Sequence, residues 1–436
     1  MNIRKIALDL LMKYEASGTY INLALSSHSA DRLTRDERAA LTALLYTTVE
    51  RKLTYDYYIS AISGRGAEDI DPYTKNILRL GICQILDMSS VPDFAAVNES
   101  VKLARNKGEG GFVNALLRSV VRQKDCLPLP REDKNYRRFL SVKYSFPLWI
   151  VKTFDRLFGR EETEKLLAVY NNENYTDLTV NTRKTTAAEL RARLAECGVE
   201  TVDSLVPDRT VRIPKSVNPE HLYGFADGLF FVQDTACVIS ALALDPKAGE
   251  RIVDTCSCPG GKSFTTAILM GDEGEIHSFD LHESKLSLIA EGAERLGISS
   301  LDIDCVDATS PREELFGKID KVICDVPCSG LGVLGKKPDL RYKSEESVAE
   351  LPALQQEILT ASAKYLKAGG EILYSTCTLR KEENEEVVEK FLECNPEFTK
   401  IDFKVGNLSS TDGMLTLIPH IHNTDGFFMA KLKKTR

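Results

Sequence analysis

The sequence predicts a protein of several domains: an all-α N-terminal domain, a small α+β linking domain and a C-terminal α/β domain with a doubly wound sheet. Three observations support this. The chain has 436 residues, which is too long for one ordinary hydrophobic core. Up to about residue 143 the apolar residues recur only at helical spacing. From about residue 228 strand patterns alternate with helical ones, which is typical of a mainly parallel sheet covered by helices on both faces.

The first region, residues 1–140, is predicted to be helical throughout. The stretch "TRDERAALTALLYTTVERKLTYDYYISAI" opens with a capping box from Thr34 to Glu37 and then carries leucines at helical spacing. Further helices are expected in "DPYTKNILRLGICQILDM" and "GGFVNALLRSVVRQK". The basic side chains on these helices, such as Arg118 and Arg122, are by themselves typical of an ordinary solvated face.

The second region, residues 141–227, is predicted to be a small α+β domain. The charge-rich stretch "PLPREDKNYRR" marks the boundary before it. The segment "TDLTVNTRKTTAAELRARLAECGV" then predicts a short strand and a helix capped from Thr186 to Glu189, with a second strand near Val211. Its basic residues, among them Arg183 and Lys184, fit either an RNA contact or a plain surface.

The third region, residues 228–436, is predicted to hold the doubly wound sheet. Strands are expected at 252–254, 275–280, 301–307, 321–325 and 371–375. In such a sheet the ligand lies at the carboxyl ends of the strands. Four of these ends carry an acidic residue, namely Asp254, Asp280, Asp307 and Asp325. We therefore expect four carboxylates around one cleft.

The composition indicates a cytoplasmic protein with reduced thiols. The N-terminus lacks the apolar core of a signal peptide, and no apolar run reaches the ~18 residues of a membrane span. The net charge is −8, so any contact with nucleic acid must come from local basic patches. The 11 cysteines contain no CxxC pair, which argues against a zinc site. Five of them are expected to be small buried hydrophobic residues: Cys83, Cys197, Cys237, Cys305 and Cys394.

The glycine turn "DTCSCPGGKS" resembles a phosphate-binding loop, but only in part. Gly261 and Lys262 fit the pattern, whereas Cys256 stands where the leading glycine belongs. Pro259 has no N–H group to offer to a phosphate. An ATPase that used Lys262 to bind phosphates and Asp325 to bind Mg²⁺ would also give no role to Cys328 and Cys377.

The acidic strand ends favour S-adenosylmethionine over a nucleotide triphosphate as the cofactor. Four carboxylates would repel a triphosphate, but they suit a molecule with a sugar, an adenine and a cationic end. Asp280 lies about 20 residues beyond the glycine turn, where doubly wound folds place an acid against the ribose hydroxyls. The single carboxylate of the cofactor could meet the helix N-terminus that follows Gly261.

Two cysteines follow neighbouring strand ends. "DVPCSG" places Cys328 after one strand and "YSTCTL" places Cys377 after the next. A thiolate is needed when the carbon to be methylated is not itself nucleophilic, as with carbon 5 of cytosine. Attack on carbon 6 makes carbon 5 electron-rich, and a base then removes the carbon 5 proton so that the thiolate can leave. Asp325 is suitably placed to hydrogen-bond N3 and the amino group of the ring.

These motifs resemble those of the RNA cytosine carbon-5 methyltransferases of the Sun/Fmu (RsmB) family, which act on 16S ribosomal RNA. "DTCSCPGGKS" is similar to the cofactor loop of the family, "DVPCSG" to its Pro–Cys motif and "YSTCTL" to its Thr–Cys motif. The helical region looks like the NusB-type RNA-binding domain that is fused to this enzyme. The resemblance therefore spans the whole chain, and it implies a Rossmann-like methyltransferase domain after an RRM-like linking domain.

The resemblance also implies roles for individual residues. Cys377 would be the nucleophile, Cys328 would assist release of the product, and Asp325 would act on the base. The implied cofactor contacts are Cys256, Ser257, Cys258, Pro259, Gly260, Gly261, Lys262, Asp280, Asp307 and Asp325. In this loop Ser257 and Cys258 replace the commoner Ala-Ala, and Ser263 replaces Thr.

The expected reaction is methyl transfer from S-adenosylmethionine to a cytosine of 16S rRNA, either naked or within an assembling small subunit. The cytosine must leave its stack, and Lys336, Lys337 and Arg341 are candidates to hold backbone phosphates. We expect a monomer that needs no metal and no membrane. Two alternatives stay open: a non-catalytic RNA-binding assembly factor, and a 5-methylcytosine enzyme that acts on another RNA such as tRNA.

Overall fold

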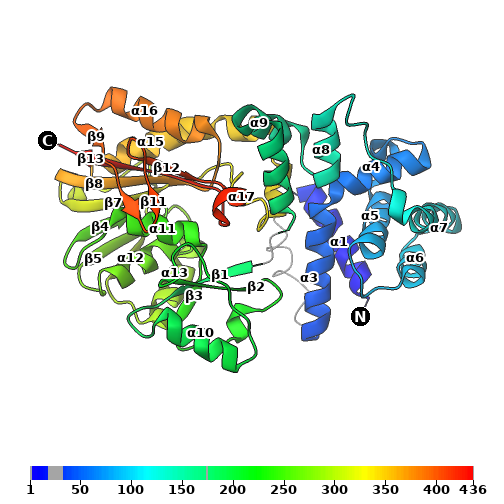
Figure 1. The fold of residues 1–436 in the computed structure, drawn as a ribbon, viewed down its shortest axis with the longest axis horizontal. Helices are drawn as coiled ribbons and strands as arrows, with labels where there is room; N and C mark the ends of the chain where they lie inside the picture. Colours follow the sequence, from blue (N-terminus) through cyan, green and yellow to red (C-terminus); the bar gives the residue numbers. More distant parts are fainter. Residues whose placement is uncertain (1, 18–32, 173–174, 436) are drawn as a thin grey trace. The chain divides into compact units, whose positions relative to one another are not determined.

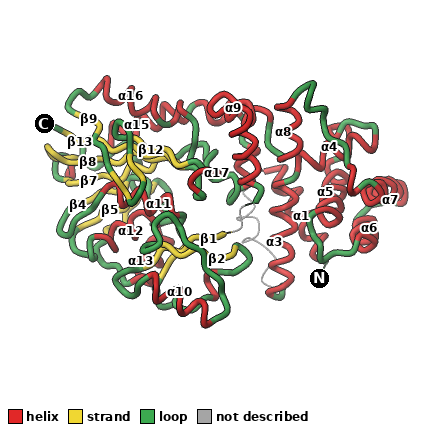
Figure 2. The backbone as a smooth tube through the Cα atoms, viewed as in Figure 1, coloured by secondary structure: helices red, strands yellow, loops and turns green. Residues whose placement is uncertain are grey.

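The computed structural model describes residues 2–17, 33–172 and 175–435. The chain forms two compact units (Figure 1). The first, here called the helical unit, comprises Met1–Asn171 together with Lys337–Lys343. The second, the sheet unit, comprises Asn172–Lys336 and Ser344–Arg436. The two units differ in secondary structure, since the described part of the first contains helices and the second contains the β-sheets (Figure 2).

The helical unit is built around α5, which is buried along most of its length. Its elements are α1 (Ile3–Ser17), α3 (Arg35–Glu50), α4 (Lys52–Ser63), α5 (Pro72–Leu86), α6 (Asp93–Val101), α7 (Lys107–Arg122), α8 (Tyr136–Tyr144) and α9 (Leu148–Tyr170), with the short 3₁₀ turns η2 (Ala67–Asp69), η3 (Lys124–Cys126) and η6 (Pro338–Tyr342). The predicted capping box is present, because the Thr34 side chain accepts the N–H of Glu37 and the Glu37 carboxylate accepts the N–H of Thr34. The apolar face of α3 lies in the core of the unit.

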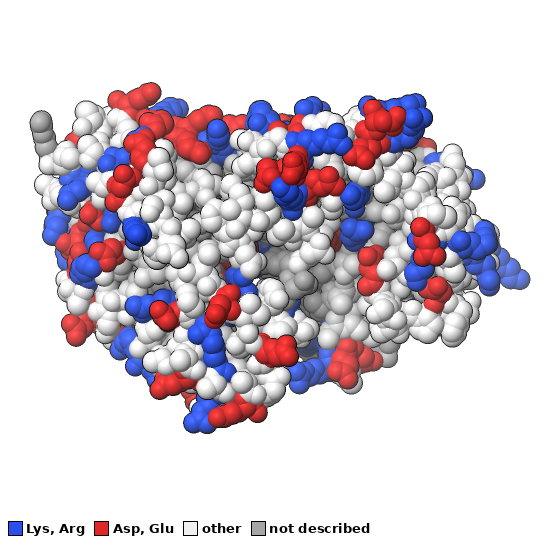
Figure 3. All heavy atoms as spheres, in the orientation of Figure 1, with Lys and Arg blue, Asp and Glu red and all other residues white. Residues whose placement is uncertain are grey.

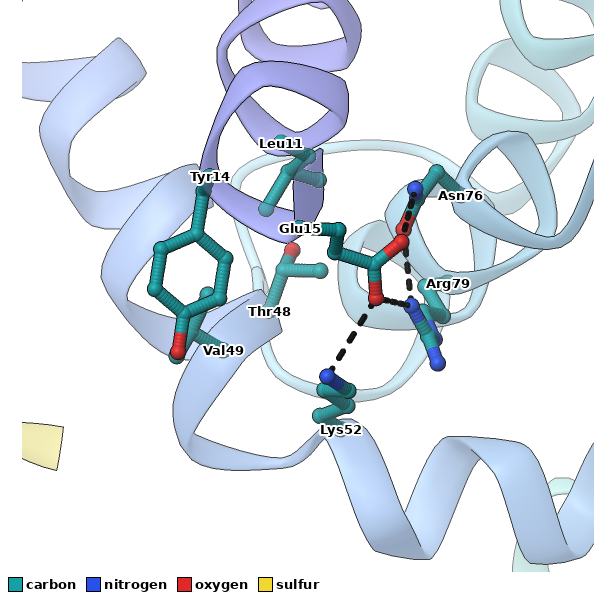
Figure 4. Close-up of a pocket in the computed structure, with 8 residues that line it drawn as sticks. All are labelled: Leu11, Tyr14, Glu15, Thr48, Val49, Lys52, Asn76 and Arg79. Carbon is teal, nitrogen blue, oxygen red and sulfur yellow. Dashed lines mark hydrogen bonds and ion pairs between the residues drawn. The ribbon is translucent and has the colours of Figure 1, made fainter. Parts of the chain in front are cut away.

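A cluster of charged side chains is enclosed between α1, α4 and α5 (Figure 4). Arg79 donates to Glu15 at 2.6 Å and to both carboxylate oxygens of Asp56 at 2.6 and 2.7 Å. Lys52 lies 3.2 Å from the same Glu15 carboxylate. Burial alone would raise the pKa of Glu15, but the charges of Arg79 and Lys52 lower it to about 2. These charges are paired with one another in an ion-pair network, so none of them is left uncompensated inside the unit.

The segment η6 belongs to the helical unit although the sequence around it belongs to the sheet unit. Its Arg341 side chain is completely buried, and the guanidinium lies 4.0 Å from the centre of the Phe146 ring. The guanidinium donates to the backbone carbonyl of Glu50 at 3.3 Å. The Tyr342 hydroxyl donates to the carbonyl of Val49 at 2.7 Å. These contacts attach the segment to α3 and to the start of α9.

The sheet unit begins with a small α+β layer. A three-stranded antiparallel sheet has the order β2-β1-β3 and carries helix α10. The bounds are β1 (Tyr175–Val180), α10 (Ala187–Glu196), β2 (Thr210–Pro214), η4 (Pro219–His221) and β3 (Phe230–Val232). The predicted cap of α10 is present, because the Thr186 side chain accepts the N–H of Glu189. One apolar core fills the space between this sheet and its helix.

The main sheet of the unit has eight strands. Its order is β12-β13-β8-β7-β4-β5-β6, and β9 pairs with β13. The strands from β8 to β6 are parallel, whereas β12, β13 and β9 are antiparallel to their neighbours. The bounds are β4 (Arg251–Asp254), β5 (Glu275–Asp280), β6 (Leu301–Cys305), β7 (Ile319–Asp325), β8 (Leu366–Thr376), β9 (Phe398–Lys400), β12 (Met414–Leu417) and β13 (Phe427–Lys434), with a separate hairpin of β10 (Lys404–Val405) and β11 (Leu408–Ser409).

Helices cover both faces of this sheet (Figure 1). Helices α11 (Thr235–Leu244), α12 (Gly261–Leu269) and α13 (Glu283–Leu296) share one apolar core with the strands. Helices α15 (Leu351–Ala363) and α16 (Glu385–Cys394) share the other. The remaining elements are η5 (Glu313–Leu315), α14 (Glu345–Ala349), η7 (Lys381–Glu383) and α17 (Pro419–His422). The expected doubly wound architecture is confirmed, and the ligand edge is the one where β4, β5 and β7 end.

The burial of the cysteines differs in part from the prediction. Cys83 is buried as expected, and Cys237 is partly buried. Cys197, Cys305 and Cys394 are exposed, so the prediction of buried residues is wrong for these three. Cys197 caps the end of α10, Cys394 ends α16, and Cys305 ends the edge strand β6. These three cysteines lie at the ends of a helix or strand that face solvent. The general tendency of cysteine to be buried does not hold at such positions.

Candidate active site

The two cysteines of the Pro–Cys and Thr–Cys motifs lie together because of the register of two strands. Strands β7 and β8 are parallel neighbours, and Asp325 is paired with Ser375 at their carboxyl ends. The motif cysteines follow shortly after these residues, so both emerge at the same edge of the sheet. The Sγ atoms of Cys328 and Cys377 lie 3.1 Å apart. Both are free thiols, and each is only partly exposed as a residue.

The Cys328 thiol is held in its neutral form. The hydrogen bond that it shares with Cys377 raises the pKa of Cys328 well above the ordinary thiol value, and burial adds to this effect. The negative charges of Glu383 and Asp325 act in the same direction. Two thiols at this distance share one charge more readily than they carry two, so one of them can donate an S–H hydrogen bond to the thiolate of the other.

Asp325 is fixed from two sides at the end of β7. Its Oδ1 accepts a hydrogen bond from the Ser375 hydroxyl at 2.6 Å, and its Oδ2 accepts one from Lys262 Nζ at 2.6 Å. Burial alone would lower the pKa of Lys262, but the charge of Asp325 raises it, so the lysine is a cation. Its ammonium group also lies 5.1 Å from the centre of the Phe427 ring. The carboxylate is therefore oriented before any ligand arrives.

The glycine turn runs from β4 into α12 and brings backbone close to the ligand edge. Gly260 has φ of 102°, in the left-handed region, and a Cβ added there would lie 2.4 Å from Phe264 Cζ. Ser257 N–H donates to the carbonyl of Phe279 at 2.8 Å, which ties the turn to β5. The first turn of α12 leaves N–H groups without intrahelical partners. Such a helix start suits a small anionic group, including the carboxylate of an amino acid.

Asp254 lies beneath this turn and is almost fully buried. Its Oδ2 accepts the Ser263 hydroxyl at 2.7 Å, whereas Oδ1 has no hydrogen-bond partner among the described protein atoms. Burial raises the pKa of Asp254 to about 7. The side chain is therefore enclosed by protein and bonded to the helix that follows the turn, whereas the sequence pattern predicted that it would face a ligand.

The other two acidic strand ends reach different positions. Asp280 ends β5, and its Oδ2 accepts the Cys258 N–H at 3.2 Å, so it touches the glycine turn. Its other oxygen accepts the N–H of His282 at 3.0 Å. Asp307 lies just beyond β6, where it is exposed and accepts the N–H and hydroxyl of Thr309 at 2.9 and 2.7 Å. Asp280 thus borders the same turn as the predicted cofactor contacts, while Asp307 stands further along the edge.

The three residues predicted to hold RNA phosphates have different environments. Lys336 is partly buried and forms ion pairs with Asp234 and with Asp425, the latter at 3.0 Å. Lys337 is exposed. Arg341 does not fit the prediction, because its side chain is buried inside the helical unit and no surface is left for a phosphate. A basic loop looks alike in sequence whether its side chains face solvent or a protein core.

Sequence reasoning missed two buried polar residues beside the thiols. Glu383 Oε2 accepts the N–H of Ser329 at 2.8 Å and the side-chain amide of Gln355 at 3.0 Å. The same amide of Gln355 donates to the carbonyl of Pro327 at 3.0 Å. The run of acidic residues after "YSTCTL" resembles a solvated helix start, and only its position directly after the thiol motif could have pointed to Glu383.

Comparison with known proteins gives the family. Residues 241–433 match the model of the 16S rRNA methyltransferase RsmB/F family, residues 1–122 match the NusB family, and residues 146–219 match the ferredoxin-like domain of RsmF/B-like methyltransferases. The probable ribosomal RNA small subunit methyltransferase B of Bacillus subtilis is 34% identical, and the alignment covers 99% of both chains. The chain belongs to the RsmB/F family of 16S rRNA methyltransferases.

Further relatives extend the match of this RsmB/F family member over its whole length. The probable ribosomal RNA small subunit methyltransferase B of Synechocystis is 36% identical over 100% of both chains. The crystal structure of PH0851 superposes with a TM-score of 0.82 at 30% identity, covering 99% of this chain and 98% of that chain. The helical NusB domain, the ferredoxin-like domain and the Rossmann-like methyltransferase domain are thus all present in one chain.

In residues 2–17, 33–172 and 175–435 of this RsmB/F family member, no helix combines the length and apolar character that crossing a membrane requires. Within the same ranges no group of three or more His, Cys, Asp and Glu side chains could hold a metal ion.

Proposed function

We propose that this enzyme transfers a methyl group from S-adenosylmethionine to carbon 5 of a cytosine in 16S rRNA, through a covalent bond between Cys377 and the base. The observation that carries the proposal is the pair of thiols 3.1 Å apart beside a carboxylate fixed at the end of the neighbouring strand. A methyltransferase that acts on an atom already nucleophilic has no need of two thiols. Carbon 5 of cytosine needs one to attack and a second group to help the first leave.

The residues around the glycine turn fit the proposed cofactor. The start of α12 offers N–H groups to its carboxylate, and Asp280 offers acceptors to its ribose hydroxyls. A Cβ at residue 260 would clash with the Phe264 ring, so only glycine fits there, and the backbone at this residue carries no side chain. When bound, S-adenosylmethionine supplies the methyl group on a positively charged sulfur.

The remaining steps are carried by residues of the chain. Cys377 Sγ forms a bond to carbon 6 of the cytosine, and the electrons of the ring move to carbon 5. Asp325 accepts a hydrogen bond from the amino group of the ring, and one from N3 once N3 takes up a proton from solvent as the ring gains electrons, while Lys262 holds the carboxylate in place. After methylation a solvent water takes the proton from carbon 5, and the electrons of that bond restore the double bond between carbons 5 and 6. The bond between Sγ and carbon 6 breaks, N3 returns its proton to solvent, and the Cys377 thiolate is restored. Cys328 assists this release from its position against Cys377.

The RNA is proposed to contact exposed cations of the helical unit. Lys337 is exposed and suits a backbone phosphate. Lys and Arg side chains gather over α7 (Figure 3), which carries Lys107, Arg118 and Arg122. The target cytosine must be unstacked for Cys377 to reach carbon 6, because a base within a helix hides that atom.

A denaturing gel tests the proposal directly. Wild type, Cys328→Ala and Cys377→Ala are incubated with small-subunit rRNA and methyl-labelled S-adenosylmethionine. A labelled protein–RNA band should accumulate in Cys328→Ala, which keeps the attacking thiol but lacks the thiol that assists release of the RNA. The band should be absent in Cys377→Ala, which lacks the attacking thiol. The reverse pattern would exchange the roles of the two thiols.

Two other outcomes separate the alternatives. Label that enters tRNA in preference to rRNA would assign the enzyme to another substrate. RNA binding without label in any RNA, from folded protein, would favour a non-catalytic assembly factor. Nucleoside analysis of the labelled product identifies the modified atom, and a product other than 5-methylcytosine would overturn the proposal.

A further inference from the structure

Glu383 is a completely buried carboxylate next to the thiol pair. It ends η7, the short turn that follows the Thr–Cys motif. The Tyr374 hydroxyl donates to its backbone carbonyl at 2.6 Å, which fixes the turn against β8. A buried carboxylate needs several donors to stay charged, and Glu383 has three: the Ser329 N–H at 2.8 Å, the Gln355 amide at 3.0 Å and an Arg380 guanidinium nitrogen at 3.4 Å.

These bonds hold the Pro–Cys loop on both sides of its cysteine. Glu383 binds the N–H of Ser329, which directly follows Cys328. Gln355 binds Glu383 and, with the same nitrogen, the carbonyl of Pro327, which directly precedes Cys328. The Ser329 hydroxyl is also 2.7 Å from the hydroxyl of Thr378, which follows Cys377. Ser329 therefore connects the two thiol loops, because it is bonded both to Glu383 and to Thr378.

The two thiols are chemically alike, and their environments must decide which one ionises. The charge of Glu383 lies against the peptide that joins Cys328 to Ser329, so an anion on Cys328 would be repelled. We propose that Glu383 positions the Pro–Cys loop and keeps Cys328 the proton-carrying member of the pair, which leaves Cys377 to ionise and attack. This inference rests on the proposed function, since it explains why one thiol is the nucleophile.

The other charged groups near Cys328 are consistent with this role. Glu383 and Asp325 both raise the pKa of Cys328, after the larger effects of its bond to Cys377 and of burial. Burial also raises the pKa of Tyr374, so its hydroxyl is neutral. Arg380 is the cation that partly offsets the charge of Glu383. Removing Glu383 should therefore raise the reactivity of the Cys328 thiol, and removing Arg380 should lower it.

The test is the alkylation rate of each thiol by iodoacetamide, followed by peptide mapping. In the Cys377→Ser background, Glu383→Gln should raise the rate at Cys328 about tenfold at neutral pH, which corresponds to about one pKa unit. In the Cys328→Ser background the same substitution should raise the rate at Cys377 by a smaller factor, since the Glu383 carboxylate is bonded to the peptide that directly follows Cys328. Equal increases at both thiols, or none at Cys328, would overturn the inference.

Two further variants control the experiment. Glu386→Gln removes an exposed carboxylate of α16 and should leave both rates unchanged. Arg380→Gln removes the cation and should slow alkylation of Cys328. If Glu383→Gln fails to fold, the Arg380→Gln result decides, and an unchanged or faster rate at Cys328 would rule the inference out.

The alkylation assay needs neither RNA nor cofactor, so its result is independent of the proposed reaction. If wild type forms no 5-methylcytosine, the proposed function fails whatever the alkylation rates are. If wild type is active and the thiol rates do not respond to the charge at residue 383, only the role of Glu383 fails. As a positioning residue, Glu383 should also shift the pH profile of methyl transfer when replaced by Gln, which a purely structural loss would not do.

Discussion

The Sγ atoms of Cys328 and Cys377 lie 3.1 Å apart although the two residues are 49 positions apart in the chain. The pairing of Asp325 with Ser375 in neighbouring parallel strands produces this contact, because each thiol follows its strand by only a few residues. The two thiols are therefore coupled, so the loss of a proton from one depends on the protonation state of the other.

Replacing Lys262 by Met should slow methyl transfer at least about a hundredfold, because Asp325 loses the cation that orients it at 2.6 Å. Breaking this partly buried ion pair should also destabilise the sheet unit, by up to about 3 kcal/mol. The measurement is the single-turnover rate at saturating RNA and cofactor. Lys285→Met, at an exposed position on α13, is the control and should react normally. A normal rate in Lys262→Met would contradict the proposed role of the pair.

Replacing Asp280 by Ala should weaken S-adenosylmethionine binding about ten- to a hundredfold, because a charged acceptor for the ribose and a partner of the Cys258 N–H are both lost. Titration calorimetry measures the cofactor affinity, and filter binding measures the RNA affinity, which should not change. Glu291→Ala, exposed on α13, serves as the control. Equal losses for cofactor and RNA would argue against contact with the ribose.

The stability of the sheet unit should fall between pH 4 and pH 7 because of Asp254. Burial raises its pKa from 3.8 to about 7, so the folded unit holds a proton in this range that the unfolded chain has released. Stability therefore decreases as pH rises, by up to about 4 kcal/mol above pH 7. Asp254→Asn carries no such proton, and its stability should depend less on pH.

Labelling of buried thiols measures the unfolding of each unit separately, and so tests the pH dependence of stability that is expected from Asp254. Cys324 is completely buried in β7 of the sheet unit, and Cys83 is completely buried in α5 of the helical unit. A short methanethiosulfonate pulse in urea, read by mass spectrometry, reports the unfolding of each unit separately. At pH 5 and pH 8 the Cys324 midpoints of wild type should differ more than those of Asp254→Asn. Identical pH dependence in the two proteins would show that Asp254 does not titrate in this way.

Replacing Arg341 by Met should destabilise the helical unit by about 2 to 4 kcal/mol, because the buried guanidinium loses its bonds to Glu50 and its contact with Phe146. Labelling of Cys83 in urea measures this loss. RNA affinity at low urea should be unchanged, since Arg341 has no exposed surface.

Lys337→Ala is the matched variant in the same segment, and it should weaken RNA binding without changing the stability of the helical unit. Its side chain is exposed, so stability should not change, whereas RNA affinity should fall and become less dependent on salt by about one counterion. Weaker RNA binding by folded Arg341→Met, with normal binding by Lys337→Ala, would reverse the assignment of the two residues.

Much of the fold could be predicted because it rests on local patterns. The capping boxes at Thr34 and Thr186 and the alternation of strands and helices after residue 228 are all present. Strand β5 has the predicted bounds, and β4, β7 and β8 differ from theirs only at the ends. The domain limits at 140 and 227 stay predictions. Local sequence determines such elements because capping and hydrophobic periodicity act over a few residues.

The sequence by itself determined which chemical groups are present: two thiols after strand ends, an acid at four of the five predicted strand ends, and a glycine turn without the leading glycine of a phosphate loop. Only the tertiary structure decided what those groups face. It paired the thiols, buried Asp254 beneath the turn, enclosed Arg341 in the helical unit and set Glu383 against the Pro–Cys loop. Burial and charge–charge contact depend on residues that are distant in sequence, and no local pattern carries that information.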